Sequence, residues 1–142
     1  MGLDAVVYRN KANIELGEKL DKAKIDERTG EIYFENEIDD RETPRDLIEA
    51  AEYRIGNIAE VDSLRDEIAT LLGPGNQIGD KVLYSGSHSG DVIPVDQLPR
   101  LAGEIESIQK MNRSSKELSR FLENLKALIN AAINENNPIV FV

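Results

Sequence analysis

Apolar residues gather in short runs that predict β-strands near both ends of the chain. Residues 3–8 form an apolar, β-branched run of the kind that fills a buried strand. Residues 22–35 predict a hairpin in which Gly30 supplies the positive φ angle of the turn. Residues 139–142 form a last apolar run. Because a short strand there needs a partner, we expect it to pair with an earlier strand in a sheet.

Two helices are predicted in the middle of the chain. Thr43 and Pro44 form a typical helix start, and apolar side chains then recur at helical spacing until Gly56. Asn57 can cap a second helix, with Glu60 three residues later as in a capping box. That helix should end at residues 73–75, which are glycine and proline. The expected inner faces are Leu47, Ile48, Ala51 and Ile55 in the first helix, and Ile58, Val61, Leu64, Ile68 and Leu71 in the second.

Two more helices are predicted after a short strand at residues 81–84. We expect Asp96 to cap the third, and Ser114 to open the fourth in an S-x-x-E capping box with Glu117. Asparagine and proline at residues 136–138 should end the fourth helix. The expected inner faces are Leu98, Leu101, Ile105 and Ile108 in the third helix, and Leu118, Phe121, Leu122, Leu125, Leu128, Ile129, Ala132 and Ile133 in the fourth.

The order of these elements favours an α+β fold. Strands and helices are partly segregated along the chain instead of alternating strictly. We therefore expect a mixed sheet of about five short strands packed by about four amphipathic helices. A chain of 142 residues suits one hydrophobic core, so residues 1–142 are predicted to form a single domain.

Charge and composition narrow the classes of function. The 17 basic and 27 acidic side chains give a net charge of −10 at pH 7, which repels phosphate backbones and anionic lipid. We therefore expect neither nucleic acid nor a membrane as a partner. The absence of cysteine excludes disulfides, thiolate nucleophiles and most zinc sites. The N-terminal residues lack the pattern of a signal peptide, so we expect a cytoplasmic protein.

Residues 85–91, SGSHSGD, which we call the serine loop, contain the only histidine of the chain. A serine with His88 as base and Asp91 as the orienting carboxylate would suit nucleophilic catalysis, but neighbours in one loop rarely adopt that geometry. His88, Asp91 and Asp80 do not have a recognisable metal-ligand spacing either. A loop whose serine hydroxyls satisfy backbone groups is the plainer interpretation. We predict no catalytic residue, no metal and no cofactor.

Acidic residues crowd the stretch of residues 26–46. Such a stretch can be a solvated face that keeps a protein soluble. It can also be an anionic patch that docks a basic protein and speeds its association. The acids that define it are Asp26, Glu27, Glu31, Glu35, Glu37, Asp39, Asp40 and Glu42.

A family resemblance is carried by residues 81–108. VLYSGSHSGDVIP at residues 82–94 is followed by LPRLAGEI at residues 98–105, and the chain opens with MGLD. This pattern resembles bacterial immunity proteins of polymorphic toxin and contact-dependent inhibition systems, in which a polar loop with histidine, serine, glycine and aspartate precedes a leucine- and glutamate-rich helix. The resemblance implies an inhibitor that binds and neutralises a cognate toxin. An acidic inhibitor would complement a basic nuclease.

The partner-binding residues are predicted in two places. One is the serine loop, because binding residues tend to follow strand ends on a rigid scaffold, and the other is the acidic stretch. Two alternatives remain open from the sequence: a small enzyme or ligand-binding domain that uses the serine loop, and a homodimeric structural module. The predicted partner-binding residues are Ser85, Ser87, His88, Ser89 and Asp91 in the loop, and Glu35, Glu37, Asp39 and Asp40 in the acidic stretch.

Overall fold

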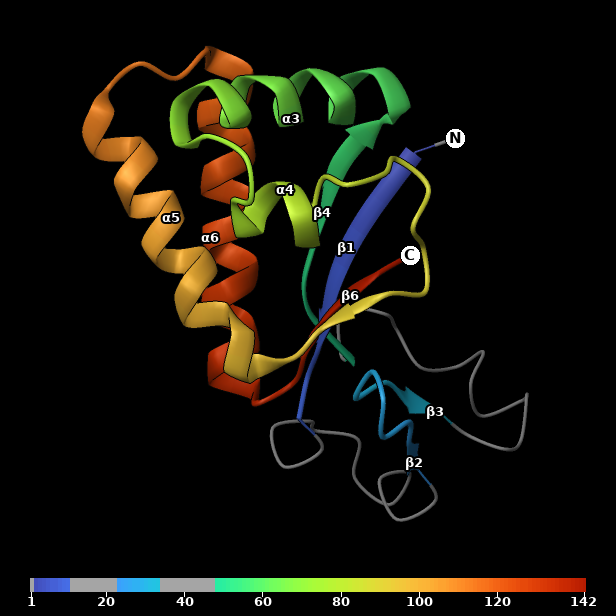
Figure 1. Cartoon of the computed structure of the whole chain (residues 1–142). Helices are drawn as coiled ribbons and strands as arrows, with labels where there is room; N and C mark the ends of the chain where they lie inside the picture. Colours follow the sequence, from blue (N-terminus) through green and yellow to red (C-terminus); the bar gives the residue numbers. More distant parts are fainter. Residues whose placement is uncertain (1, 11–22, 34–47) are drawn as a thin grey trace.

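An antiparallel sheet of four strands forms one layer of the molecule, in the order β4-β1-β6-β5 (Figure 1). The computed structural model describes residues 2–10, 23–33 and 48–142. Its sheet strands are β1 (Gly2–Tyr8), β4 (Glu49–Asn57), β5 (Val92–Ile93) and β6 (Ile139–Phe141). The predicted α+β class is confirmed. The expected mixed sheet is wrong, because every pair among the described strands is antiparallel.

β6 lies inside the sheet, between β1 and β5. Phe141 pairs with Ala5 of β1, and Val140 pairs with Val92 of β5. All three residues of β6 are buried. The expectation that this last apolar run pairs with an earlier strand is therefore confirmed.

The predicted hairpin forms a separate two-stranded sheet below the larger one in Figure 1. Its strands are β2 (Lys24–Ile25) and β3 (Ile32–Tyr33), which pair antiparallel. Gly30 has a φ of 79° in the turn, and its N–H donates to the Asp26 carbonyl at 2.7 Å. An added Cβ at Gly30 would also collide with the Asn137 side chain, so glycine is required there.

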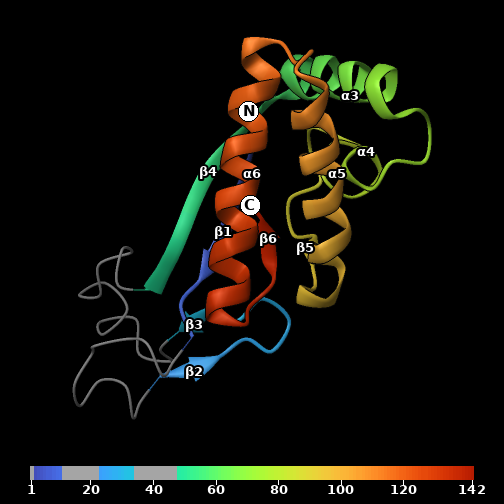
Figure 2. The same ribbon diagram turned by 90° about the vertical axis from the view of Figure 1, so that its left-hand side faces the viewer.

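Four helices among the described residues cover one face of the sheet (Figures 1 and 2). They are α3 (Ile58–Leu72), α4 (Gln77–Lys81), α5 (Leu98–Met111) and α6 (Lys116–Glu135). α6 packs on β1 and β4, α5 packs on α6, and α3 contacts β4 and α6. None of these helices is long and apolar enough to cross a membrane.

Most of the predicted helical faces are confirmed. The Asn57–Glu60 capping box at the start of α3 is present with both of its hydrogen bonds. The predicted inner face of α5 is wholly buried, and that of α6 is buried from Leu118 to Ala132. The assignment of Ile58 and Ile133 to the inner faces is wrong, because 56% and 52% of these residues are exposed.

Residues 49–57 form the strand β4 instead of the predicted first helix. Tyr53 and Ile55 are partly or fully buried, and they alternate with the exposed side chains of Glu52 and Arg54. The segment therefore carries a two-residue period as well as a helical one. The segment forms a strand instead of a helix because it pairs with the largely buried strand β1 along the whole length of β1.

Three smaller predictions around the helices are also wrong. Val82 and Leu83 are buried but belong to a turn after α4 instead of a strand, since both their N–H groups donate to the Ile78 carbonyl. Asp96 lies in a 3₁₀ turn, Val95–Gln97, and does not cap α5. α6 is capped by Ser115, one residue after Ser114. The Ser115 hydroxyl accepts from Leu118 N–H, and the Glu67 carboxylate of α3 holds Ser115 in place.

Candidate functional site

The serine loop lies between the turn that follows α4 and the strand β5, and it packs on α3 near one end and bonds to β6 at the other. Gly86 packs so closely on Ile58 at the start of α3 that a Cβ there would lie 2.7 Å from the Ile58 Cα. Gly90 N–H donates to the Phe141 carbonyl at 2.7 Å, and Phe141 N–H donates to the Asp91 carbonyl at 2.9 Å. These two bonds continue the β5–β6 ladder into the last two residues of the loop and fix that end of it to the sheet.

His88 is the internal anchor of the serine loop. Its ring is stacked on Tyr84, with centroids 4.2 Å apart, and meets Phe141 edge-on at 4.4 Å. Only 7% of His88 is exposed, and its Nε2–H donates to the Val82 carbonyl at 2.7 Å. The imidazole therefore packs as part of the interior and closes the loop onto the turn that precedes it.

Burial lowers the pKa of His88 below its ordinary value of 6.5, and the hydrogen bond to the Val82 carbonyl opposes this effect. The Nδ1 atom has no hydrogen bond, although the Asp91 carboxylate lies 3.6 Å away. That carboxylate is half exposed to water, which weakens its pull on a proton. We conclude that His88 is neutral at pH 7, with the proton on Nε2.

The remaining polar side chains of the serine loop face one another or the solvent. The Ser85 hydroxyl lies 3.2 Å from that of Ser87 and accepts from Ser87 N–H, as in a serine turn. Ser87 and Ser89 are exposed, whereas Ser85 and Asp91 are half-buried. No serine of the loop bonds to His88, whose Nε2–H is engaged by backbone. The loop as folded therefore lacks the serine–histidine pair that nucleophilic catalysis requires.

The structure brings together no metal-ligand set in its described part. Within residues 2–10, 23–33 and 48–142, no group of three or more histidine, aspartate or glutamate side chains is arranged to hold a metal ion. The predicted partner-binding acids Glu35, Glu37, Asp39 and Asp40 lie outside the described residues. Asp26 and Glu27, at the start of the same acidic stretch, are exposed in the hairpin turn.

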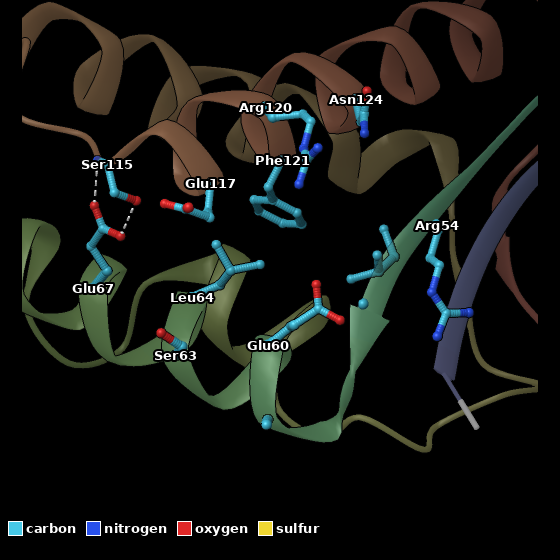
Figure 3. A pocket seen from close by; sticks show the side chains of 13 residues that line it. Arg54, Glu60, Ser63, Leu64, Glu67, Ser115, Glu117, Arg120, Phe121 and Asn124 are labelled. Carbon is cyan, nitrogen blue, oxygen red and sulfur yellow. Dashed lines mark hydrogen bonds between the residues drawn. The ribbon is translucent and has the colours of Figure 1, made fainter.

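A groove of about 680 Å³ lies between β4, α3 and the first half of α6 (Figure 3). Its floor is apolar and is formed by Ile55 of β4, Leu64 of α3 and Phe121 of α6. Charged side chains surround this floor. The carboxylates are Glu60, Glu67 and Glu117, and the guanidinium groups are Arg54 and Arg120.

Glu67 joins the two helical walls of the groove. One carboxylate oxygen accepts from Ser115 N–H at 2.7 Å, and the other accepts from the Ser115 hydroxyl at 2.6 Å (Figure 3). Such charge-assisted bonds are short and strong. Glu67 therefore links the start of α6 to α3 on one side of the groove.

The other charged groups of the groove are only partly engaged. One oxygen of Glu60 accepts from Asn57 N–H at 3.0 Å, and Arg54 lies 3.5 Å from the Asp4 carboxylate. In the part of the chain that the structure describes, the side chains of Glu117 and Arg120 have neither a hydrogen bond nor an ion pair. The groove thus combines an apolar floor with charged groups that are available to a ligand.

Sequence reasoning missed this groove because its β4 wall was predicted as a helix. Glu60 and Phe121 were recognised only as a capping residue and a core residue. The alternation of Tyr53 and Ile55 with Glu52 and Arg54 was the one signal that could have indicated the strand and hence the groove.

Comparisons of the chain with protein-family models, curated proteins and solved structures give no match.

Proposed function

We propose that this chain is an immunity protein that binds a cognate bacterial toxin in the cytoplasm and neutralises it by stoichiometric contact, without catalysis. The groove between β4, α3 and α6 is the observation that carries this proposal. An apolar centre surrounded by charged groups is the usual anatomy of a surface that recognises another protein. Its walls belong to a sheet and two helices, so the surface is held in shape before a partner arrives.

The charge of the chain supports the same proposal. A net charge of −10 raises the rate of encounter with a basic protein such as a nuclease toxin. The serine loop offers an additional rigid edge, with Ser87 and Ser89 facing the solvent. An enzyme built on this loop has weaker support, because its histidine is buried and bonded to the Val82 carbonyl, and no serine of the loop bonds to it.

The test begins with the protein encoded next to this chain. Co-purification of the two should yield an equimolar complex, and co-expression should restore growth that the neighbouring protein inhibits. Raising the salt concentration should slow association and change dissociation little, because exposed charges are screened beyond a Debye length of roughly 8 Å at physiological ionic strength. The absence of both a complex and protection would refute the proposal.

The acidic stretch provides a second arm of this experiment. Joint replacement of Glu35, Glu37, Asp39 and Asp40 by their amides should slow association with the toxin if this stretch faces the partner. An association rate that does not respond to these replacements would assign binding to another surface, and the groove is then the first candidate.

A further inference from the structure

We propose that the groove between β4, α3 and α6 binds a short partner segment in which an apolar side chain adjoins an arginine or lysine. This inference rests on the proposed function only in assigning the segment to a toxin. The groove and its charges are properties of this chain alone, so the chemistry can be tested with small peptides.

The apolar part of the segment is indicated by the groove floor. Ile55, Leu64 and Phe121 are each less than a tenth exposed, and they are reached from solvent through the groove. A volume of about 680 Å³ lies in the range of sites that enclose a small ligand. One leucine-sized side chain on this floor would remove its own surface and that of the floor from water, which is favourable for binding.

The basic part of the segment is indicated by two carboxylates on facing walls. Glu117 of α6 has no partner among the described residues, and Glu60 of α3 has one carboxylate oxygen beyond its capping bond. In Figure 3 Glu117 lies near Phe121 on α6, and the Glu60 carboxylate points from α3 into the groove. A guanidinium between them would meet two anions and an aromatic face, and each of these favours a cation.

The two arginines of the groove do not make it a site for an anion. Arg54 is paired with Asp4, and its guanidinium points toward β1, away from the Phe121 ring (Figure 3). The net charge of −10 opposes an anionic ligand further. Arg120 and Asn124 lie one turn apart on α6 and can instead donate to the carbonyl oxygens of a bound peptide.

The experiment titrates the ¹⁵N-labelled protein with three capped dipeptides in amide-shift NMR spectra. They are acetyl-Leu-Arg-amide, its neutral isostere acetyl-Leu-citrulline-amide, and acetyl-Leu-Glu-amide. We expect saturable shifts at residues 55–64 and 117–124 with the arginine peptide. The citrulline peptide should bind about five- to tenfold more weakly, since it lacks the charge. The glutamate peptide should not saturate.

Matched variants locate the cation. Glu60→Gln and Glu117→Gln should each weaken binding of the arginine peptide about two- to fivefold. Glutamine at position 60 keeps the capping box, so α3 should remain intact. Glu106→Gln is the control, because Glu106 is exposed on α5 and pairs with Lys110 away from the groove. It should leave the affinity unchanged.

Two results would overturn the inference. One is equal affinity for the arginine and glutamate peptides, and the other is the absence of saturable shifts in the groove. The proposed function is tested separately. If a toxin complex forms and ignores Glu60→Gln and Glu117→Gln, the groove inference is wrong while the inhibitor role stands. If the arginine peptide binds but the neighbouring protein does not, the inhibitor role fails and the groove assignment stands.

Discussion

The serine loop and the groove use their polar groups in opposite ways. In the serine loop, His88 bonds to Val82, Gly90 bonds to Phe141, and the hydroxyl of Ser85 is paired with the turn around it. In the groove, Glu117 and Arg120 have no bonding partner within the described residues. Apart from the Nδ1 atom of His88, the buried polar groups of the loop are bonded within the loop and its neighbours, whereas the groove leaves charged groups of common residue types without partners.

This difference shows that the position of a residue in the fold, and not its type alone, decides what the residue does. A histidine among serines is typical of chemistry, yet burial and a backbone carbonyl turn His88 into a packing element. Glutamate and arginine are ordinary surface residues, yet β4, α3 and α6 place several of them around the apolar floor of the groove. Availability to a ligand is thus decided by which polar groups the fold leaves without a partner.

The largest effect is expected from the helix that supports the groove floor. Leu125 is fully buried on α6, one turn after Phe121, and Leu125→Asp places a charge in the core. We expect a loss of unfolding free energy of about 4 kcal/mol or more, measured by urea denaturation. Lys126→Asp, on the exposed side of the same helix, is the control. An unchanged midpoint for Leu125→Asp would show that α6 is not packed as described.

A smaller but clear loss is expected for the anchor of the serine loop. His88→Ala removes the contacts with Tyr84 and Phe141 and leaves the Val82 carbonyl unpaired, which should cost about 2–3 kcal/mol. Ser87→Ala, at an exposed position of the same loop, should change stability by less than about 0.5 kcal/mol. If the two variants were equally stable, the loop would not be locked by its histidine, and a binding role for the imidazole would regain support.

The junction of the groove walls should be somewhat weaker than the loop anchor. Glu67→Ala removes both hydrogen bonds to Ser115 and should cost about 2 kcal/mol. Asp66→Ala is the matched control, because Asp66 is the exposed neighbour on α3. Thermal melts of both variants should show a lower melting temperature for Glu67→Ala than for Asp66→Ala. Equal stability would mean that Glu67 does not hold α6 against α3.

The smallest effect concerns the proton of His88. Its lowered pKa means that the unfolded chain binds a proton more readily than the folded one below pH 6.5. The stabilisation is therefore complete above pH 6.5 and is lost as the pH falls through the folded-state pKa. His88→Gln, which keeps a donor for Val82 but cannot titrate, should lose less stability than the wild type between pH 7.5 and 5.5. The opposite order would show that the Asp91 carboxylate dominates over burial.

The helices and their buried faces were largely predictable, because their causes are local. The α3 capping box and the α6 stripe are read from residues a few positions apart, and both are present in the structure. The cap of α6 shifted by one residue for a nonlocal reason, the bond between Ser115 and Glu67 on another helix. Local signals therefore locate these helices, and contacts between helices set their ends.

The strand β4 and the groove were not predictable, because they depend on contacts between residues far apart in the sequence. The segment around Tyr53 satisfies both a helical and an alternating pattern, and only its pairing with β1 selects the strand. The groove then depends on three elements that meet in space, which no spacing along the chain encodes. The serine loop was located correctly by its glycines and serines, but the inward path of its histidine was not evident from them.

The position of β6 between β1 and β5 has a consequence for how the chain folds. The sheet closes only when segments far apart in sequence meet, as in the hydrogen bond from the Asn137 side chain to the Tyr8 carbonyl, across 129 positions. Closing so long a loop is entropically costly and makes folding slow relative to helix formation. Until β6 inserts, β1 has one neighbour and β5 has none in the described sheet. We therefore expect the helices to collapse early around an unfinished sheet, and the native state to appear in one late, cooperative step.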